Sequence, residues 1–367
     1  MTKQDKIILG LSGGVDSATA ACLLKQNNHN LEAVFMKNWD EDDDEDYCPA
    51  EQDLADAREI ATSLDIPIHT VNFASEYWDR VFSHFLDEYK AGRTPNPDIL
   101  CNSEIKFKVF LDYAIEKFCQ NDAEKLKIAT GHYARIREQD GQFYLLKGLD
   151  NNKDQSYFLH ALNQYQLSHA LFPLGELNKN EVREIAKSHQ LSVFDKKDST
   201  GICFIGERNF NEFLSRFLSS EPGDMITPEG EVVAQHKGLM YYTIGQRKGL
   251  GIGGSKNSSG EPWFVADKNK QQNQLIVVQG KDHPSLYQSE LLASNLHWIN
   301  QIPAKLPYSC QAKTRYRQPD QECTIDSLEA DNTAKVRFSK PQFGVTPGQS
   351  IVFYENDVCL GGGVIEF

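Results

Sequence analysis

Residues Gly10-Leu-Ser-Gly-Gly-Val-Asp-Ser17 are the stretch around which the rest of this chain is organised. The apolar run at 6–9 before it predicts a buried strand, and residues 18–25 after it predict a helix. A glycine-rich turn between a strand and a helix points several backbone N–H groups at one place, where the helix dipole adds positive potential. With the hydroxyls of Ser12 and Ser17 beside these groups, the stretch predicts a pyrophosphate site.

This turn differs from the two common nucleotide loops. It has no lysine of the kind that a P-loop needs, and the dinucleotide pattern Gly-x-Gly-x-x-Gly is absent from it. It resembles instead the PP-loop of ATP pyrophosphatases, which cleave ATP between the α- and β-phosphates and leave AMP on a substrate. The alternative is a glycine turn that only joins strand to helix. The resemblance assigns ATP contacts to Gly10, Leu11, Ser12, Gly13, Gly14, Val15, Asp16 and Ser17.

Strand and helix patterns alternate through the first part of the chain, which predicts an α/β fold with a parallel sheet covered on both faces. Nucleotides bind such sheets at the carboxyl ends of strands. Met36, at the end of the second strand, is therefore an adenine contact or a core residue. Gly131 follows the fourth strand and allows a ligand close to the backbone, while His132 is a ligand contact or a loop histidine. The expected strands are 6–9, 31–36, 66–72 and 126–130, and the expected helices are 18–25, 50–64, 76–90, 104–118 and 181–189.

Composition indicates an ordinary globular protein of two or three domains. The chain has 367 residues, 40% hydrophobic and 25% charged, without an apolar run near the ~20 residues that span a bilayer. Because the N-terminus has no signal-peptide core, we expect a cytoplasmic protein with no membrane partner. Eight cysteines are scattered without a Cys-x-x-Cys pair, which argues against a disulfide framework and against a zinc or iron–sulfur site.

The charge distribution separates three regions. Residues 1–213 carry a net charge of −13, against +1 in 214–279 and −2 in 280–367. The acidic run 40–46 is typical of a solvated loop. We therefore expect a PP-loop domain at 1–213, a small central linker domain of mixed or β structure at 214–279 and a C-terminal domain at 280–367.

The C-terminal region consists of short β-rich runs separated by turn residues, which predicts a small antiparallel barrel. The expected strands are 274–278, 309–315, 322–328, 335–338, 350–354 and 358–365. In the strand expected at 310–317, Lys313, Arg315 and Arg317 alternate onto one face. Such a basic face beside a tyrosine suits an RNA backbone and an unstacked base, or is simply solvated. The run Gly249–Gly254 fits the dinucleotide pattern, but it lacks a preceding strand and a following helix, so we interpret it as a hairpin loop.

Two cysteines stand in polar loops. Two prolines in three residues predict a rigid, extended segment at 92–101 that ends in Cys101, just ahead of a helix. A thiol near a helix N-terminus has a larger thiolate fraction, and Lys106 and Lys108 favour it further. Asp98 is a candidate general base, and the alternative for Cys101 is a buried structural cysteine. Cys203 also follows a basic, glycine-bearing segment, so the two together suggest paired sulfur chemistry.

Seven motifs spread over nearly the whole chain resemble those of bacterial tRNA-specific 2-thiouridylases, which place sulfur on C2 of the wobble uridine. The two cysteine motifs carry the resemblance most specifically, since many adenylating enzymes share the PP-loop. One small departure is Ala18, where a second serine is expected after Ser17. The motifs are 12–17, 92–102, 131–135, 153–157, 197–205, 243–254 and 315–317.

The resemblance implies functional roles for residues in these motifs. Cys203 carries a persulfide, Cys101 is the nucleophile and Asp98 the base, and a disulfide between the two cysteines remains after each turnover. ATP and Mg²⁺ would adenylate the uridine of tRNAs for Lys, Glu and Gln, and a sulfur-relay protein or cysteine desulfurase would load Cys203. The tRNA contacts implied are Asn96, Pro97, Asp98, His132, Lys153, Asp154, Gln155, Arg315, Tyr316 and Gln349.

Two other functions fit parts of the sequence. An amidating PP-loop ligase, such as a GMP, NAD or argininosuccinate synthetase, would adenylate its substrate and then accept an amine. It would need neither cysteine, so activity that survives thiol alkylation would favour it. A tRNA-binding module without chemistry would release neither AMP nor pyrophosphate when ATP and tRNA are supplied together.

Overall fold

The N-terminal part of the chain is built on a parallel sheet. The computed structural model describes residues 6–27, 30–39, 49–119, 125–198, 210–253 and 260–366. All strand pairs of the first sheet are parallel, in the order β3-β2-β1-β4-β7, which confirms the predicted α/β architecture. The strands are β1 (Lys6–Gly10), β2 (Asn30–Lys37), β3 (Ile68–Asn72), β4 (Leu126–Ala129) and the short β7 (Ala170–Leu171).

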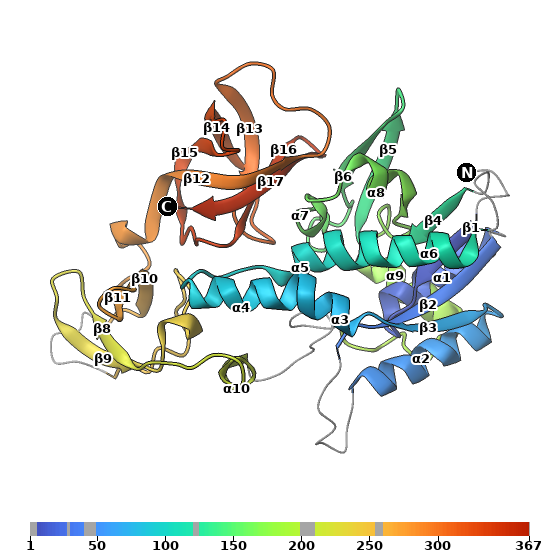
Figure 1. The fold of residues 1–367 in the computed structure, drawn as a ribbon, viewed down its shortest axis with the longest axis horizontal. Coiled ribbons are helices and arrows are strands. Elements are labelled where there is room, and N and C mark those ends of the chain that lie inside the picture. The colour runs from blue at the N-terminus through green and yellow to red at the C-terminus, as the bar shows by residue number, and fades with distance from the viewer. Residues whose placement is uncertain are drawn as a thin grey trace.

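Helices cover both faces of this sheet because successive strand residues point to opposite sides. Ile7 and Leu9 of β1 pack in a cluster with α1 (Val15–Gln26), α2 (Pro49–Ser63) and α9 (Lys179–Ser188). Ile8 lies on the other face, in the cluster that includes α4 (Ser83–Lys90) and α6 (Phe110–Phe118). Figure 1 shows this sheet and its helices at right, with the C-terminal barrel above and the small central sheet at lower left.

The helix expected at 76–90 is one helical run with a wider middle turn. It consists of α3 (Ala74–Tyr77), the π-helical segment η1 (Trp78–Phe82) and α4. Tyr77, Val81, Phe85 and Tyr89 are buried, as their spacing predicts.

The segment at 92–101 is not extended throughout, and this part of the prediction is wrong. A helix begins at Pro97 with α5 (Pro97–Leu100) and continues through the π-helical η2 (Cys101–Val109) into α6. Proline at the first helical position loses only an N–H that would have no partner in the helix. The side chain of Asn96 caps the helix by accepting a hydrogen bond from the N–H of Asp98 at 3.2 Å.

A hairpin joins the N-terminal part to the barrel. Its strands are β5 (Ala134–Gln139) and β6 (Gln142–Lys147), and Asp140 and Gly141 between them have φ of 53° and 74°. Such a turn is the one that an Asp-Gly pair favours. β6 pairs with β17 of the barrel, so the hairpin extends the barrel's sheet.

The C-terminal part is a closed antiparallel barrel of six strands, as predicted. Neighbouring strands run in the order β12-β15-β14-β13-β16-β17, and the additional pairing of β12 with β17 closes the ring. Its interior is apolar, with residues such as Ile325, Val336 and Phe353 at 0% exposure. The strands are β12 (Tyr287–Trp298), β13 (Tyr308–Lys313), β14 (Gln321–Leu328), β15 (Ala334–Phe343), β16 (Ser350–Glu355) and β17 (Val358–Glu366).

The central part contains a four-stranded sheet in the order β10-β11-β8-β9. Its strands are β8 (Gly223–Ile226), β9 (Val232–His236), β10 (Trp263–Asn269) and β11 (Gln274–Gln279). The described part of the run 249–254 is neither strand nor helix, which agrees with its interpretation as a loop. The remaining short helices are α7 (Ser156–Leu159), α8 (Gln164–His169), α10 (Phe210–Ser215), η3 (Leu239–Tyr241) and η4 (Pro284–Leu286). In the ranges described, no helix is long and apolar enough to cross a bilayer.

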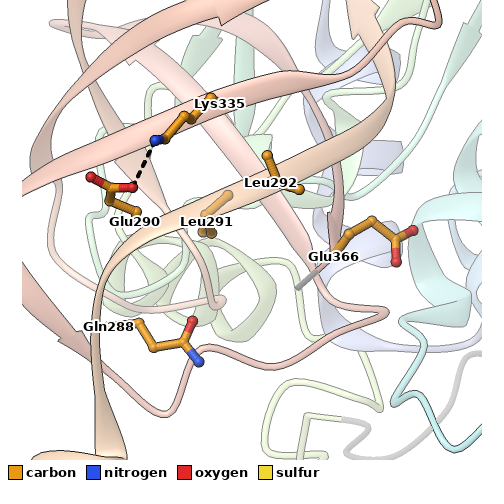
Figure 2. A pocket seen from close by; sticks show the side chains of 6 residues that line it. All are labelled: Gln288, Glu290, Leu291, Leu292, Lys335 and Glu366. Carbon is orange, nitrogen blue, oxygen red and sulfur yellow. Dashed lines mark ion pairs between the residues drawn. The ribbon is translucent and has the colours of Figure 1, made fainter.

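A hollow of about 210 Å³ lies on the barrel (Figure 2). Lys335 and Glu290 form a 3.0 Å ion pair in it, and the lining residues all come from β12, β15 and β17. None of the site residues expected from the sequence lines this hollow, so it is not the candidate functional site.

Candidate functional site

The predicted nucleotide residues lie where the order of the parallel sheet reverses. The PP-loop follows β1 and Gly131 follows the neighbouring β4, and ligands of such folds bind at this reversal. A Cβ on Gly131 would lie 2.9 Å from the backbone N of Ser17, so the two loops touch backbone to backbone. A Cβ on Gly10 would lie 3.2 Å from Cε of Met36, which places this methionine beneath the loop.

The PP-loop is ordered by its own hydroxyls. Oγ of Ser17 accepts a hydrogen bond from the N–H of Ser12 at 3.2 Å and donates to the carbonyl of Gly14 at 3.1 Å. Gly13 has φ of 74°, and a Cβ there would lie 2.3 Å from the carbonyl oxygen of Asp53, so only glycine fits. The loop is thus held in shape at the N-terminus of α1, whose first N–H groups have no partner in the helix.

Two lysines and two carboxylates form a network beside this loop, and only Asp16 and Lys153 among them were expected from the sequence to be site residues. Asp16 Oδ1 accepts from Lys179 Nζ and from the Tyr133 hydroxyl, both at 2.7 Å. Lys179 Nζ also lies 2.6 Å from Asp198 Oδ1, and Lys153 Nζ lies 2.5 Å from Asp198 Oδ2. Burial alone would raise the pKa of Asp198, but hydrogen bonds from Lys153 and Lys179 outweigh it and lower the pKa.

A third lysine, Lys196, connects the PP-loop to α2. Its Nζ donates to the Gly13 carbonyl at 3.1 Å, to Asp53 at 2.8 Å and to Asp56 at 2.5 Å. Burial alone would lower the pKa of Lys196, but the hydrogen bonds to Asp53 and Asp56 raise it instead. Lys196 is therefore a fixed, fully paired cation that joins the loop to α2.

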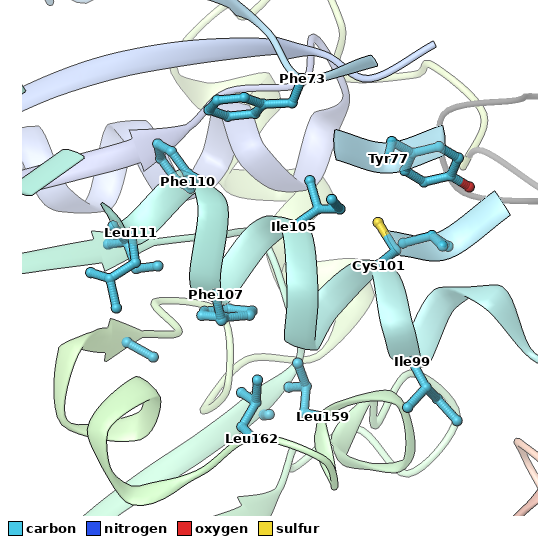
Figure 3. Packing of buried hydrophobic residues seen from close by; sticks show 14 of the residues in the cluster. Phe73, Tyr77, Ile99, Cys101, Ile105, Phe107, Phe110, Leu111, Leu159 and Leu162 are labelled. Atoms are coloured by element: carbon cyan, nitrogen blue, oxygen red, sulfur yellow. The ribbon is translucent and has the colours of Figure 1, made fainter. Parts of the chain in front are cut away.

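Cys101 lies inside a helix and not at its start. The helix begins at Pro97, so Cys101 is past the first turn, and its exposure is 0%. Figure 3 shows its sulfur between Tyr77 and Ile105 in the cluster beneath the sheet. The expected position at a helix N-terminus is wrong, because Pro97 starts the helix earlier. Cys101 thus occupies a buried position, which was the alternative expected from the sequence. Asp98 is half-buried in the first turn of the helix.

Cys203 lies outside the described residues, since the segment 199–209 is not among them. Asp198, which is bound to Lys153 and Lys179, is the last described residue before that segment.

His132 is a buried histidine beside the Cys101 helix. Its Nδ1 lies 2.7 Å from the Thr130 hydroxyl, and its ring lies 6.0 Å from that of Phe107. Burial, helped by the charge of Lys106, lowers the pKa of His132 well below its ordinary value, so the ring is neutral at pH 7.

Hydrogen bonds and ion pairs bind the segment 153–155 both to the N-terminal part of the chain and to the barrel. Asp154 is 4% exposed and accepts hydrogen bonds from the N–H of Gly148 at 3.1 Å and of Ser156 at 3.0 Å. Its other oxygen lies 3.3 Å from Nζ of Lys313 in the barrel. Gln155 Oε1 accepts from the N–H of Tyr133, one residue after His132, at 3.0 Å.

The basic stripe expected at 310–317 does not form a solvated face. β13 ends at Lys313, which is 9% exposed, and the chain turns after it. Arg315 Nη2 donates to the carbonyls of Ile244, at 3.1 Å, and of Gly344, and thereby bridges the central part and the barrel. Burial lowers the pKa of Arg315. Arg317, in the turn, is exposed with φ of 65°.

A chain of contacts leads from the barrel to the Cys101 helix. The rings of Tyr316 and Phe158 lie 4.4 Å apart, and Nδ2 of Asn102 donates to the Phe158 carbonyl at 3.0 Å. Nε2 of Gln349 donates to the Thr94 carbonyl at 2.7 Å, two residues before Asn96. Tyr316 and Gln349, two residues assigned to tRNA by the resemblance, are thus linked through Phe158 and Thr94 to the helix that carries Cys101 and to the segment before it.

Asn38 is a residue that sequence reasoning missed. It directly follows β2 at the ligand edge of the sheet, and its side chain is 1% exposed. Neither its Oδ1 nor its Nδ2 has a hydrogen-bond partner in the described part of the chain. Buried amides are nearly always paired, so this one is a candidate ligand contact. No pattern in the sequence distinguishes it from an ordinary loop asparagine.

The chain matches three family descriptions in succession. Residues 5–207 match the tRNA methyl transferase HUP domain, 211–279 match the tRNA methyl transferase PRC-barrel domain, and 288–365 match the aminomethyltransferase beta-barrel domain.

Full-length relatives carry one name. The chain is 57% identical over 363 residues to the tRNA-specific 2-thiouridylase MnmA of Psychromonas ingrahamii, covering 99% of this chain and 97% of that protein. It is 59% identical over 360 residues to the protein of that name from Methylobacillus flagellatus, covering 98% of each. Among solved structures, the NMN synthetase of Francisella tularensis has a TM-score of 0.32 and 18% identity, over 59% of this chain and 79% of its own. That likeness is too distant to carry an argument.

Proposed function

The chain belongs to the tRNA-specific 2-thiouridylase family, and on this premise we propose that it uses ATP to convert the wobble uridine of tRNA into 2-thiouridine. The observation that supports this most directly is the convergence on one helix. A Cβ on Gly10 of the PP-loop would lie 3.6 Å from the Phe110 ring on the same helical run as Cys101. Phe158, which contacts Tyr316, accepts a hydrogen bond from Asn102 of that run, and Gln349 binds Thr94 just before it.

The first step is adenylation. The C2 oxygen of uridine is a poor leaving group, so transfer of AMP to it prepares the carbon for attack. A bond forms between that oxygen and the α-phosphorus while the bond to the bridging oxygen of pyrophosphate breaks. The backbone N–H groups of the PP-loop and the hydroxyls of Ser12 and Ser17 would hold the phosphates. We place the adenine against Met36 and the nucleotide close to Gly131.

Magnesium fits the donor set of this site. Mg²⁺ usually keeps several waters and binds through one or two carboxylates together with phosphate oxygens, so Asp16 at the mouth of the loop suffices. When bound, the ion would neutralise charge on the phosphates. Among the described residues no cluster of three or more acidic, histidine or cysteine side chains could hold a metal by itself, which agrees with a site that the nucleotide completes.

The second step is sulfur transfer from a persulfide on Cys203. In one route the terminal sulfur attacks C2 and AMP leaves, after which the Cys101 thiolate attacks Sγ of Cys203 and releases the thiolated base. In the other route the Cys101 thiolate first attacks Sγ of the Cys203 persulfide and frees hydrosulfide, which then attacks C2 and displaces AMP. Both routes end in a Cys101–Cys203 disulfide, which an external reductant must cleave before the next turnover. Asp98 would act as the base.

The partners follow from this chemistry. We propose cytoplasmic tRNAs for Lys, Glu and Gln as substrates, and a sulfur-relay protein or cysteine desulfurase as the persulfide donor. The flipped uracil would contact Asn96, Pro97 and Asp98. The remaining contacts proposed for tRNA are His132, Lys153, Asp154, Gln155, Arg315, Tyr316 and Gln349.

One experiment tests this function. Unmodified tRNA is incubated with the enzyme, ATP and a persulfide donor, and its nucleosides are analysed by mass spectrometry while pyrophosphate is quantified. We expect 2-thiouridine and pyrophosphate in equal amounts, both dependent on tRNA. Pyrophosphate release that requires ammonia and leaves the tRNA unmodified would instead identify an amidating ligase.

A further inference from the structure

The PP-loop of this chain contains no lysine or arginine, although it must bind a strongly anionic leaving group. P-loops solve this problem with a lysine in the loop itself. Here a candidate comes from a different part of the chain. Lys179 lies 163 residues after Asp16, and its Nζ is 2.7 Å from that carboxylate in the first turn of α1.

Lys179 is held at this position by rigid elements. It is the first residue of α9, and Asn178 and Glu181 form a capping box at that end of the helix. α9 packs directly on α1, where Val182 and Ala186 enter the shared core and the Thr19 hydroxyl donates to the Val182 carbonyl at 3.3 Å. The helix that carries the lysine and the helix that begins at the PP-loop therefore form one unit.

The charges around Lys179 differ from those around Lys196. Lys196 is matched by two carboxylates, Asp53 and Asp56, and by the Gly13 carbonyl. Around Lys179, in contrast, the carboxylates of Asp16 and Asp198 face three cations, because Lys153 lies 2.5 Å and Arg183 3.6 Å from Asp198. A third carboxylate, Asp150, accepts from the backbone N–H of Lys179 at 3.0 Å, so the cations of this network are matched but not outnumbered, and the Lys179 side chain keeps 11% of its surface exposed.

We propose that Lys179 is a catalytic residue of the adenylation step that contacts the β-phosphate of ATP and stabilises the departing pyrophosphate. The proposal rests on the function proposed above. As the bond between the α-phosphorus and the bridging oxygen breaks, its electron pair stays on that oxygen, and the ammonium neutralises the new charge without giving up a proton. Asp16 and Asp198 hold Lys179 in place when no nucleotide is bound.

The test compares variants of the full-length enzyme. Lys179→Met and Lys179→Gln remove the charge, while Lys179→Arg keeps it. Loss of one donor aimed at developing charge typically costs about 100- to 1,000-fold in kcat. We expect the neutral variants to lose about 100-fold in kcat for tRNA-dependent pyrophosphate release, and Lys179→Arg to recover at least about tenfold of that loss. Tyr133→Phe removes the other hydrogen bond to Asp16 Oδ1 and no charge, so its effect should be much smaller. Lys187→Met, an exposed position on the same helix, should behave like the wild type.

A second readout separates a phosphate contact from a structural role. Calorimetry with pyrophosphate alone and with AMP alone should show about tenfold weaker pyrophosphate binding to Lys179→Met, with AMP and tRNA binding unchanged. The proposal fails if kcat stays within about threefold of the wild type, if Tyr133→Phe is equally impaired, if AMP binding falls instead, or if both neutral variants fail to fold. A wild-type enzyme that releases no pyrophosphate with tRNA would overturn the proposed function itself.

Discussion

The carboxylate of Asp154 and the ammonium of Lys313 lie 3.3 Å apart with side-chain exposures of 2% and 11%. The pair joins the N-terminal part of the chain to the barrel across 159 residues of sequence. Removing one partner of a buried ion pair leaves an uncompensated charge, which is far more costly than losing an exposed pair. The pair therefore holds the 153–155 segment, which we propose contacts tRNA, in its position against the barrel.

We expect Asp154→Ala to lower the free energy of unfolding by about 3–5 kcal/mol, because hydrogen bonds from Gly148, Ser156 and Lys313 are all lost. Denaturant unfolding of this variant, of Lys313→Met and of the double variant would give the coupling between the two residues. Asp326→Ala, which breaks the more exposed pair with Arg337, is the control and should change the stability much less. Additive effects of the two single changes would show that the buried pair is not an energetic unit.

Arg315 has two separable roles, a bridge to two carbonyls and a proposed contact with tRNA phosphate. Arg315→Lys keeps the charge but loses the guanidinium bridge to Ile244 and Gly344, so the melting temperature should fall while the salt dependence of tRNA binding stays as in the wild type. Arg315→Ala should lower the melting temperature and also reduce the salt slope by about one. Filter binding at several salt concentrations measures the slope, and an unchanged slope for Arg315→Ala would mean that this residue does not face the RNA.

His160 lies against β17 of the barrel, where a Cβ on Gly362 would be 2.6 Å from its Cδ2, and we expect this contact to be acid-sensitive. It is 4% exposed, its Nδ1–H donates to the Tyr157 carbonyl at 2.8 Å, and burial lowers its pKa to about 4. Between pH 6.5 and about 4 the unfolded chain binds a proton that the folded state does not, so stability falls as the pH falls through this window. The loss is at most about 3–4 kcal/mol, since each pKa unit is worth about 1.4 kcal/mol.

Unfolding curves of the wild type and of His160→Gln at several pH values would measure this contribution. The difference in stability between the two proteins should shift in favour of the variant as the pH falls from 7 to 4. A difference that is constant with pH would show that His160 does not titrate on unfolding in this range.

The parallel sheet and most barrel strands could be predicted because their signals are local. The strand runs are short, rich in apolar residues and bounded by turn residues. β12 escaped prediction for a physical reason: its pairing with β17 shifts register between Ser294 and His297, and this irregularity breaks the alternation of buried residues. The start of the helix at Pro97 was also missed, because proline stops a helix only from inside it and is well suited to its first position.

The candidate site could be predicted from the sequence only where its residues belong to a local motif or stand at the end of a predicted strand. The PP-loop is a local motif, and its residues lie together with Met36 and Gly131. Lys179 had no signal of its own, because its position beside Asp16 depends on the packing of α9 on α1. Burial of Cys101 likewise comes from Tyr77 and Ile105 packing around it, although the sequence around it is polar. Lys313 and Arg315 were expected on one basic face, for RNA or simply solvated, but tertiary contacts make them internal bridges.

The last prediction concerns the two cysteines of the sulfur-transfer step. Cys203→Ser should still form adenylated tRNA but never hold a persulfide, because a serine oxygen cannot accept the transferred sulfur. Cys101→Ser should be loaded at Cys203 yet yield little 2-thiouridine, since no thiolate is present to attack Sγ of Cys203 and release the sulfur. Intact-protein mass spectrometry would detect the persulfide, and nucleoside analysis would give the yield. Cys119→Ser, half-buried just after α6, is the control and should thiolate normally. Without reductant, only the wild type and this control should accumulate a Cys101–Cys203 disulfide, and a normal 2-thiouridine yield from either of the first two variants would end the mechanism.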